Sequence, residues 1–189
     1  DVLTSRGLGD VYKRQPWDHS ECLIALAIYE EWDPFIRGVN WFFDNLNSDG
    51  LIPSEFKNDE ITKDYYESHH APYIFLPLYQ KFLIDNDTDY IKQYKKQIQT
   101  IYKTTLAFAD SQGFLFWAKD EKGFSDNSLV TASCSVHISL KIFEKIADII
   151  GLDYSHDEIL LNEEKINSKR FDRDGISRKR FSIDKYYTI

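Results

Sequence analysis

The chain has 189 residues, a formal net charge of −8 at pH 7 and a pI of about 5.1, and this acidity argues against nucleic acid and anionic membranes as partners. Hydrophobic residues make up 42% of the sequence and aromatic residues 15%, which is enough for one folded core. The sequence has no continuous apolar run of membrane-spanning length and no secretory signal, so we expect no membrane span and a cytoplasmic location.

The two ends of the sequence do not resemble natural termini. The run from Asp10 to Gln15 resembles the translation of a sequencing-adapter end, and the chain contains no methionine. We therefore expect residues 1–15 to be a non-native scar and residues 16–189 to be a fragment of one domain.

Hydrophobic periodicity predicts about six helices. The first begins at Asp18, which forms a capping box with Glu21, and the second begins at Asp33-Pro34. A proline at position 77 is expected to kink the third helix. Only residues 114–118 have an extended pattern, so we predict an all-α chain. The expected helices span about 18–31, 34–46, 68–84, 89–111, 129–150 and 156–169.

The predicted helices form antiparallel hairpins whose connections alternate between short and long. In such an array every second connection lies at the same end, so the long connections share one face, where binding and catalytic loops are commonly built. That face would gather aromatic, imidazole and carboxylate side chains. The expected site residues are Trp17, Asp18, His19, Glu21, Glu67, His69, His70, Trp117, Asp120, Asp184 and Tyr186.

Short motifs along the chain resemble those of the (α/α)6 toroids. The resemblance extends to six-hairpin glycosidases of the glucoamylase-like kind, to terpenoid-cyclase and prenyltransferase toroids, and most specifically to an uncharacterised bacterial family often labelled prenyltransferase-like. It implies a partial toroid of about half a ring, with the missing C-terminal half of the same domain as a partner. The segments that carry it are Trp17–Cys22, Ala71–Ile74, Trp117–Asp120, Thr131–Ser135 and Asp184–Tyr187.

A carbohydrate-active hydrolase is the function that these residues favour. An inverting glycosidase needs a carboxylic acid and a carboxylate base about 6.5–9.5 Å apart, and the candidates are Asp18, Glu67 and Asp120. Two indoles could stack on sugar rings, and the remaining polar side chains could bind hydroxyl groups. The substrate-binding candidates are Trp17, His19, Glu21, His69, His70, Trp117, Asp184 and Tyr186. Helix caps and solvated loop charges are the alternative interpretation of the carboxylates.

Two other functions remain open at this point. The abundant aromatic residues permit a prenyltransferase or terpenoid-cyclase-like site, and paired helices also form non-catalytic binding scaffolds. The spacing of cysteine, histidine and aspartate shows no metal motif, so we expect no metal and no cofactor. Cys22 and Cys134 lie in apolar helical patterns and are expected to be reduced, buried thiols, and His137 is expected to be a core histidine.

Overall fold

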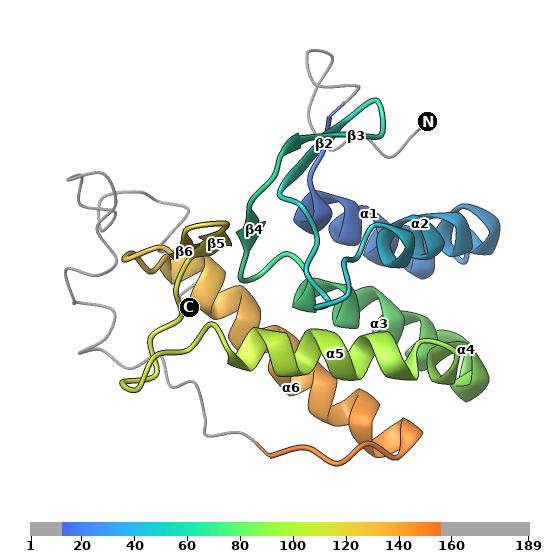
Figure 1. The fold of residues 1–189 in the computed structure, drawn as a ribbon. Coiled ribbons are helices and arrows are strands. Elements are labelled where there is room, and N and C mark those ends of the chain that lie inside the picture. The colour runs from blue at the N-terminus through green and yellow to red at the C-terminus, as the bar shows by residue number, and fades with distance from the viewer. Residues whose placement is uncertain (1–12, 156–189) are drawn as a thin grey trace.

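The computed structural model of the chain describes residues 13–155, so the helix expected at about 156–169 lies outside the described residues. Helices dominate the fold, one short strand precedes the first helix, and others occupy the long connections between later ones (Figure 1). The elements are β1 (Lys13–Arg14), α1 (Pro16–Ile28), α2 (Trp32–Asp44), β2 (Glu55–Lys57), β3 (Glu60–Lys63), β4 (Tyr66–Glu67), the 3₁₀ helix η1 (Pro72–Ile74), α3 (Phe75–Asp85), α4 (Thr88–Lys92), α5 (Lys95–Leu106), β5 (Ala118–Asp120), β6 (Gly123–Phe124) and α6 (Val130–Ile150).

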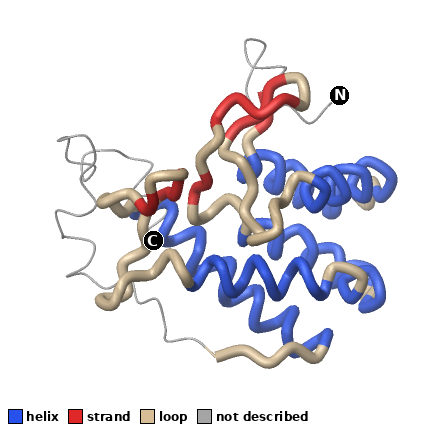
Figure 2. Tube along the Cα trace, in the orientation of Figure 1, coloured by secondary structure: helices blue, strands red, loops and turns tan. Residues whose placement is uncertain are grey.

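Two small antiparallel sheets overturn the all-α prediction. One sheet has the strand order β1-β2-β3 and the other has the order β4-β5-β6. Figure 2 shows these strands as short red segments at the edge of the blue helices. The expected all-α half-toroid is therefore wrong, and the described residues form a mixed α/β structure.

The β2–β3 hairpin shows why the strands were missed. Lys57 pairs with Glu60, and the two turn residues between them, Asn58 and Asp59, both have positive φ angles of 52° and 64°. Such a two-residue turn matches the twist of the strands, and Asn and Asp tolerate its left-handed conformation. The flanking strands are short and carry many charged side chains, so their sequence resembles a solvated loop.

Helix α1 starts earlier than predicted. Pro16 occupies its first turn, and Gln15 is the N-cap residue without a side-chain cap bond. A proline is well suited to this position because its missing N–H would have no helical partner. Asp18 lies inside the first turn, so the predicted capping box with Glu21 is wrong.

The third and fourth predicted helices are each interrupted. The chain turns through residues 68–71 and the 3₁₀ helix η1 before α3 begins at Phe75, so Pro77 lies in the first turn of α3 rather than in the middle of a long helix. The fourth divides into α4 and α5, and α5 ends at Leu106. The helix predicted at 129–150 corresponds closely to α6, which ends at Gly151 with a φ of 64°.

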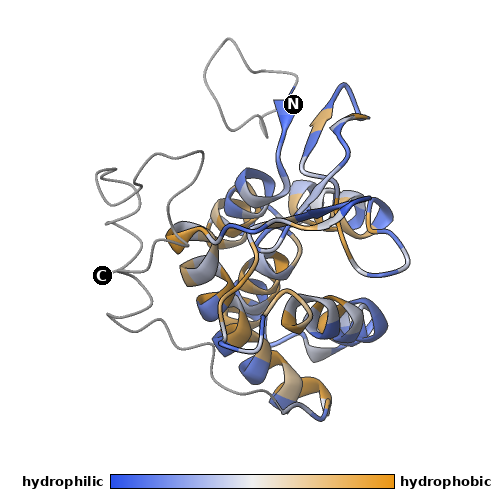
Figure 3. Ribbon diagram, turned by 60° about the vertical axis from the view of Figure 1, so that its left-hand side comes forward, coloured by the Kyte–Doolittle hydropathy of each residue, from blue (hydrophilic) through white to orange (hydrophobic). Residues whose placement is uncertain are grey.

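One continuous hydrophobic core joins the helices. Helix α1 packs against α2 and α3, and α6 packs against α3, α4 and α5. Aromatic rings pack within the core, where the Phe143 ring stacks on that of Tyr102 at 4.0 Å and lies tilted at 5.4 Å from that of Phe75. Figure 3 shows the hydrophobic residues concentrated in this helical layer. Among the described residues, no helix combines the length and apolar character that a membrane-spanning segment requires.

The contact between α1 and α2 depends on a glycine. A Cβ atom added to Gly38 would lie 2.5 Å from Leu23 Cδ2, which is closer than carbon atoms approach one another. We predict that Gly38→Ala lowers the free energy of unfolding by about 1–3 kcal/mol, measured by urea denaturation. Arg37→Ala, at the exposed neighbouring position, should change it by less than about 0.5 kcal/mol. Equal effects of the two substitutions would contradict the close packing.

Candidate functional site

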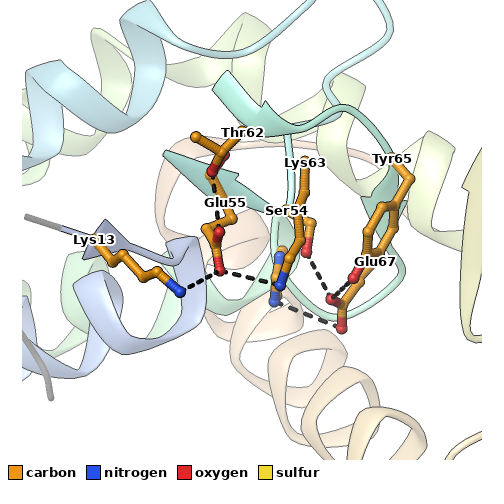
Figure 4. Close-up of polar contacts among 8 residues, drawn as sticks. Lys13, Ser54, Glu55, Thr62, Lys63, Tyr65 and Glu67 are labelled. Atoms are coloured by element: carbon orange, nitrogen blue, oxygen red, sulfur yellow. Dashed lines mark hydrogen bonds and ion pairs between the residues drawn. The ribbon is translucent and has the colours of Figure 1, made fainter. Parts of the chain in front are cut away.

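Glu67, on strand β4, is the centre of a buried polar cluster. Its Oε1 accepts hydrogen bonds from the hydroxyl groups of Ser54 at 2.6 Å and Tyr65 at 3.3 Å, and its Oε2 accepts one from Trp117 Nε1 at 3.0 Å. Figure 4 shows the Ser54 and Tyr65 hydroxyl groups directed at this carboxylate. Its side chain is 11% exposed, so protein donors replace most of the water that a carboxylate normally binds.

Backbone hydrogen bonds fix the segments that supply these donors. Glu67 pairs with Ala118 across β4 and β5, and the Ser68 amide donates to the Trp117 carbonyl at 2.9 Å. The Ser54 amide donates to the Tyr65 carbonyl at 2.9 Å. The β-structure that the sequence did not predict therefore positions the carboxylate and its donors.

Two consecutive histidines face the same carboxylate oxygen. The Nε2 atoms of His69 and His70 lie 3.8 Å and 3.7 Å from Glu67 Oε2. The two residues are only 4% and 3% exposed, and within the described part of the chain neither Nδ1 atom has a hydrogen-bond partner. Both imidazoles are therefore buried with much of their hydrogen-bonding capacity unused.

Residues at the start of helix α1 pack against the histidines of the cluster. The Trp17 ring contacts the rings of His69 and Tyr73 edge to face, with centroids 5.0 Å and 5.7 Å apart. The Tyr73 hydroxyl donates to Glu21 Oε1 at 3.0 Å. We call the side chains of Trp17, Glu67, His69, His70 and Trp117 the Glu67 cluster.

Burial keeps both imidazoles of the cluster neutral. It lowers the pKa of His69 to about 3, with the charge of His70 acting in the same direction and that of Glu67 opposing it. Burial also lowers the pKa of His70, against the opposing negative charges of Glu67 and Asp18. Asp18, in the first turn of α1, is thus close enough to act electrostatically on the cluster.

The Glu67 carboxyl is held in its charged form. Burial alone would raise its pKa, but the positive charge that His70 and His69 can carry and the hydrogen bonds from Ser54 and Trp117 lower it below the usual range. Where the imidazoles are neutral, the hydrogen bonds from Ser54 and Trp117 still favour the charged form. The cluster is therefore one fixed negative charge beside two neutral imidazoles.

Several expected site residues lie elsewhere. His19 is buried between α1 and α2, where its Nε2 atom donates to the Gly38 carbonyl at 2.9 Å and its ring packs 4.6 Å from Trp41. Asp120 is exposed in the β5–β6 turn, where it accepts a hydrogen bond from the Lys122 amide at 2.8 Å. Asp184 and Tyr186 lie outside the described residues.

Three hydroxyl residues of the site were not predicted from the sequence: Ser54, Tyr65 and Tyr73. Each supplies a hydroxyl group to a carboxylate of the site. Their only sequence signal is the density of hydroxyl groups around Glu67, which does not distinguish a partner from a solvated residue. Cys22 and Cys134 are free thiols, and Cys22 is only partly buried rather than fully buried as expected.

No family model matches the chain. It is 20% identical over 174 residues to the MMP endo-(1,4)-3-O-methyl-α-D-mannosidase of Mycolicibacterium hassiacum, and the matched region covers 92% of this chain and 48% of that protein. The chain therefore spans about half the length of this curated relative. This likeness is a distant one to a glycoside hydrolase.

Removing the shortest hydrogen bond to Glu67 should raise its pKa. The low pKa means that the charged carboxylate stabilises the fold above its unfolded pKa, and that this contribution is lost as the pH falls through the folded pKa. We predict that Ser54→Ala shifts this loss to higher pH and lowers the free energy of unfolding near neutral pH by about 1.5–3 kcal/mol. Carboxyl ¹³C NMR titration and urea denaturation measure the two effects. Ser48→Ala, at an exposed position, is the control, and an unchanged Glu67 titration in Ser54→Ala would contradict the assignment.

His19 should behave as a neutral core residue. Burial lowers its pKa to about 4, partly opposed by its hydrogen bond to Gly38. Because the unfolded chain takes up this proton near pH 6.5 and the folded chain does not, stability should fall on acidification by up to about 1.4 kcal/mol per pH unit for this residue. NMR of the imidazole nitrogens should show a neutral ring at about pH 5.5 in the folded protein. A charged ring at that pH would contradict its structural assignment.

Proposed function

We propose that the chain is part of a carbohydrate-active hydrolase that cleaves α-mannosidic linkages in a glycan. The distant likeness to an endo-mannosidase supports the substrate class. The observation that carries the proposal is that Asp18 lies close to the Glu67 cluster, which includes its neighbour Trp17 at the start of α1. Carboxylates, imidazoles and indole rings are the groups that glycosidases use to transfer protons, to bind hydroxyl groups and to stack on sugars.

In this proposal Asp18 is the carboxylate that transfers a proton to or from the glycosidic bond. Asp18, in the first turn of α1, and Glu67 are both partly buried, but Glu67 has hydrogen-bond donors on both oxygens. Glu67 instead acts as a fixed negative charge that positions the imidazoles and the Trp117 indole. Trp17 and Trp117 are both partly exposed and offer apolar ring surface to a sugar.

Asp120 has no role in this proposal because it is an exposed turn residue with a local hydrogen bond. The inverting outcome expected from the sequence requires a second carboxylate about 6.5–9.5 Å from Asp18. Proton NMR identifies the anomer of the sugar that is released first, and this anomer shows whether the configuration is inverted.

The test uses the 189-residue chain with α-linked manno-oligosaccharides and, for comparison, β-linked ones. We predict cleavage of the α-linked substrates alone, and a reduction of about 10²–10⁴-fold in kcat for Asp18→Asn with little change in binding. The matched control Asp120→Asn should keep the wild-type rate.

Two results would contradict the proposal. One is that Asp18→Asn and Asp120→Asn retain equal hydrolytic rates. The other is that none of the α-linked oligosaccharides binds to the chain, measured as a change in tryptophan fluorescence or by calorimetry.

A further inference from the structure

The atoms of Glu67, His69 and His70 converge as metal ligands do. One carboxylate oxygen and two imidazole nitrogens lie within 4.8 Å of one another, and the distances from Glu67 Oε2 to the two Nε2 atoms are 3.8 Å and 3.7 Å. These distances are too long for hydrogen bonds. Ligands at about 2.0–2.2 Å from a tetrahedral Zn²⁺ are separated by about 3.3–3.6 Å. The two oxygen–nitrogen distances are close to this range, and the two nitrogens, which lie within 4.8 Å of each other, would have to move closer together to complete the site.

We propose that Glu67, His69 and His70 form a binding site for a divalent transition-metal ion of the Zn²⁺ class. This inference goes beyond the proposed hydrolase activity and does not depend on it. Two neutral imidazoles with one carboxylate are a donor set that suits Zn²⁺ and its neighbours, whereas Mg²⁺ and Ca²⁺ prefer oxygen ligands alone. Three protein ligands leave a fourth position for water or another small ligand.

The surroundings of Glu67 support this assignment. Trp117 donates to Oε2, and Ser54 and Tyr65 donate to Oε1, so the carboxylate is oriented by neighbours in the way that metal-binding carboxylates are. These three hydrogen bonds direct Oε2 at the imidazoles. A bound cation would also add a positive charge beside the Glu67 carboxylate, in addition to the nearby charge of Lys63.

The positions of the two imidazoles are a second argument for a metal site. His69 and His70 are almost fully buried, and their Nε2 atoms lie 3.8 Å and 3.7 Å from Glu67 Oε2, beyond hydrogen-bond distance. A metal ion between Glu67 and the imidazoles would give each Nε2 atom a ligand bond where the contact to Oε2 is too long for a hydrogen bond. His19 illustrates the contrast, because its Nε2 atom has the Gly38 carbonyl at 2.9 Å.

The experiment uses the 189-residue chain without an affinity tag and after removal of metals by a chelator. Calorimetric titration with Zn²⁺ should give one site per chain, and Co²⁺ should give the absorption bands of a four-coordinate site. His69→Gln and His70→Gln should each weaken Zn²⁺ binding by at least about tenfold. His137→Gln, on α6, is the matched control and should bind Zn²⁺ as the wild type does. Mg²⁺ and Ca²⁺ should not compete.

A measurement on the unaltered chain covers the case in which these variants do not fold. Bound Co²⁺ should shift or broaden the amide NMR signals of residues 67–70 and of Trp17, which lies beside His69. The proposal is overturned if the wild type binds no Zn²⁺, if folded His70→Gln binds it as tightly as the wild type, or if the affected signals surround Cys22 or Cys134 instead. None of these results involves a glycan, so this test is separate from that of the hydrolase.

Discussion

A carboxylate that is largely removed from water needs hydrogen-bond donors from the protein. Glu67 has this need, and the segments that supply its donors are held in place by the short strands. Its donors come from Ser54, before β2, and from Trp117, before β5, which are far apart in the sequence. The short strands hold these segments at fixed positions, since a flexible loop would leave the charge without reliable partners. Although the sheets are small, they hold the Glu67 carboxylate and its hydrogen-bond donors at fixed positions.

Helix α1 forms the other side of the site because its own position is fixed from within. His19 bonds to the Gly38 carbonyl, and Gly38 lets Leu23 approach α2 closely. This contact fixes the helix, and its first turn then directs Trp17 towards His69. His19, which was predicted to bind substrate, is therefore a core residue that helps to fix the position of α1.

The sequence predicted the apolar elements better than the polar ones. The long periodic pattern of α6 and its glycine end were recognisable, since helical periodicity over many residues has few alternative interpretations. The β2–β3 hairpin was not, because its strands are short and charged and its turn uses Asn58-Asp59 in place of the usual glycine. The capping-box pattern at Asp18 was misleading because Pro16 starts the helix, so Gln15 is the N-cap residue and Asp18 lies inside the first turn.

The candidate site was also predicted only in part from the sequence. Trp17, Glu67, His69, His70 and Trp117 were singled out by residue type, and the structure brings them together. Residue type could not separate them from His19 or Asp120, whose surroundings depend on the packing of α2 and on the β5–β6 turn. Convergence of two nitrogens on one oxygen is a property of three-dimensional position, and no spacing in the sequence encodes it.

The Glu67 charge and the Trp117 indole stabilise each other through the hydrogen bond from Nε1 to Oε2. A double-mutant cycle on the free energy of unfolding, with Glu67→Gln, Trp117→Phe and the double variant, measures this coupling. The structure predicts a coupling free energy of about 1.5–3 kcal/mol, the value of a buried hydrogen bond to a charged group. Additive effects within about 0.5 kcal/mol would show that the two side chains do not depend on each other and would contradict this account of the site.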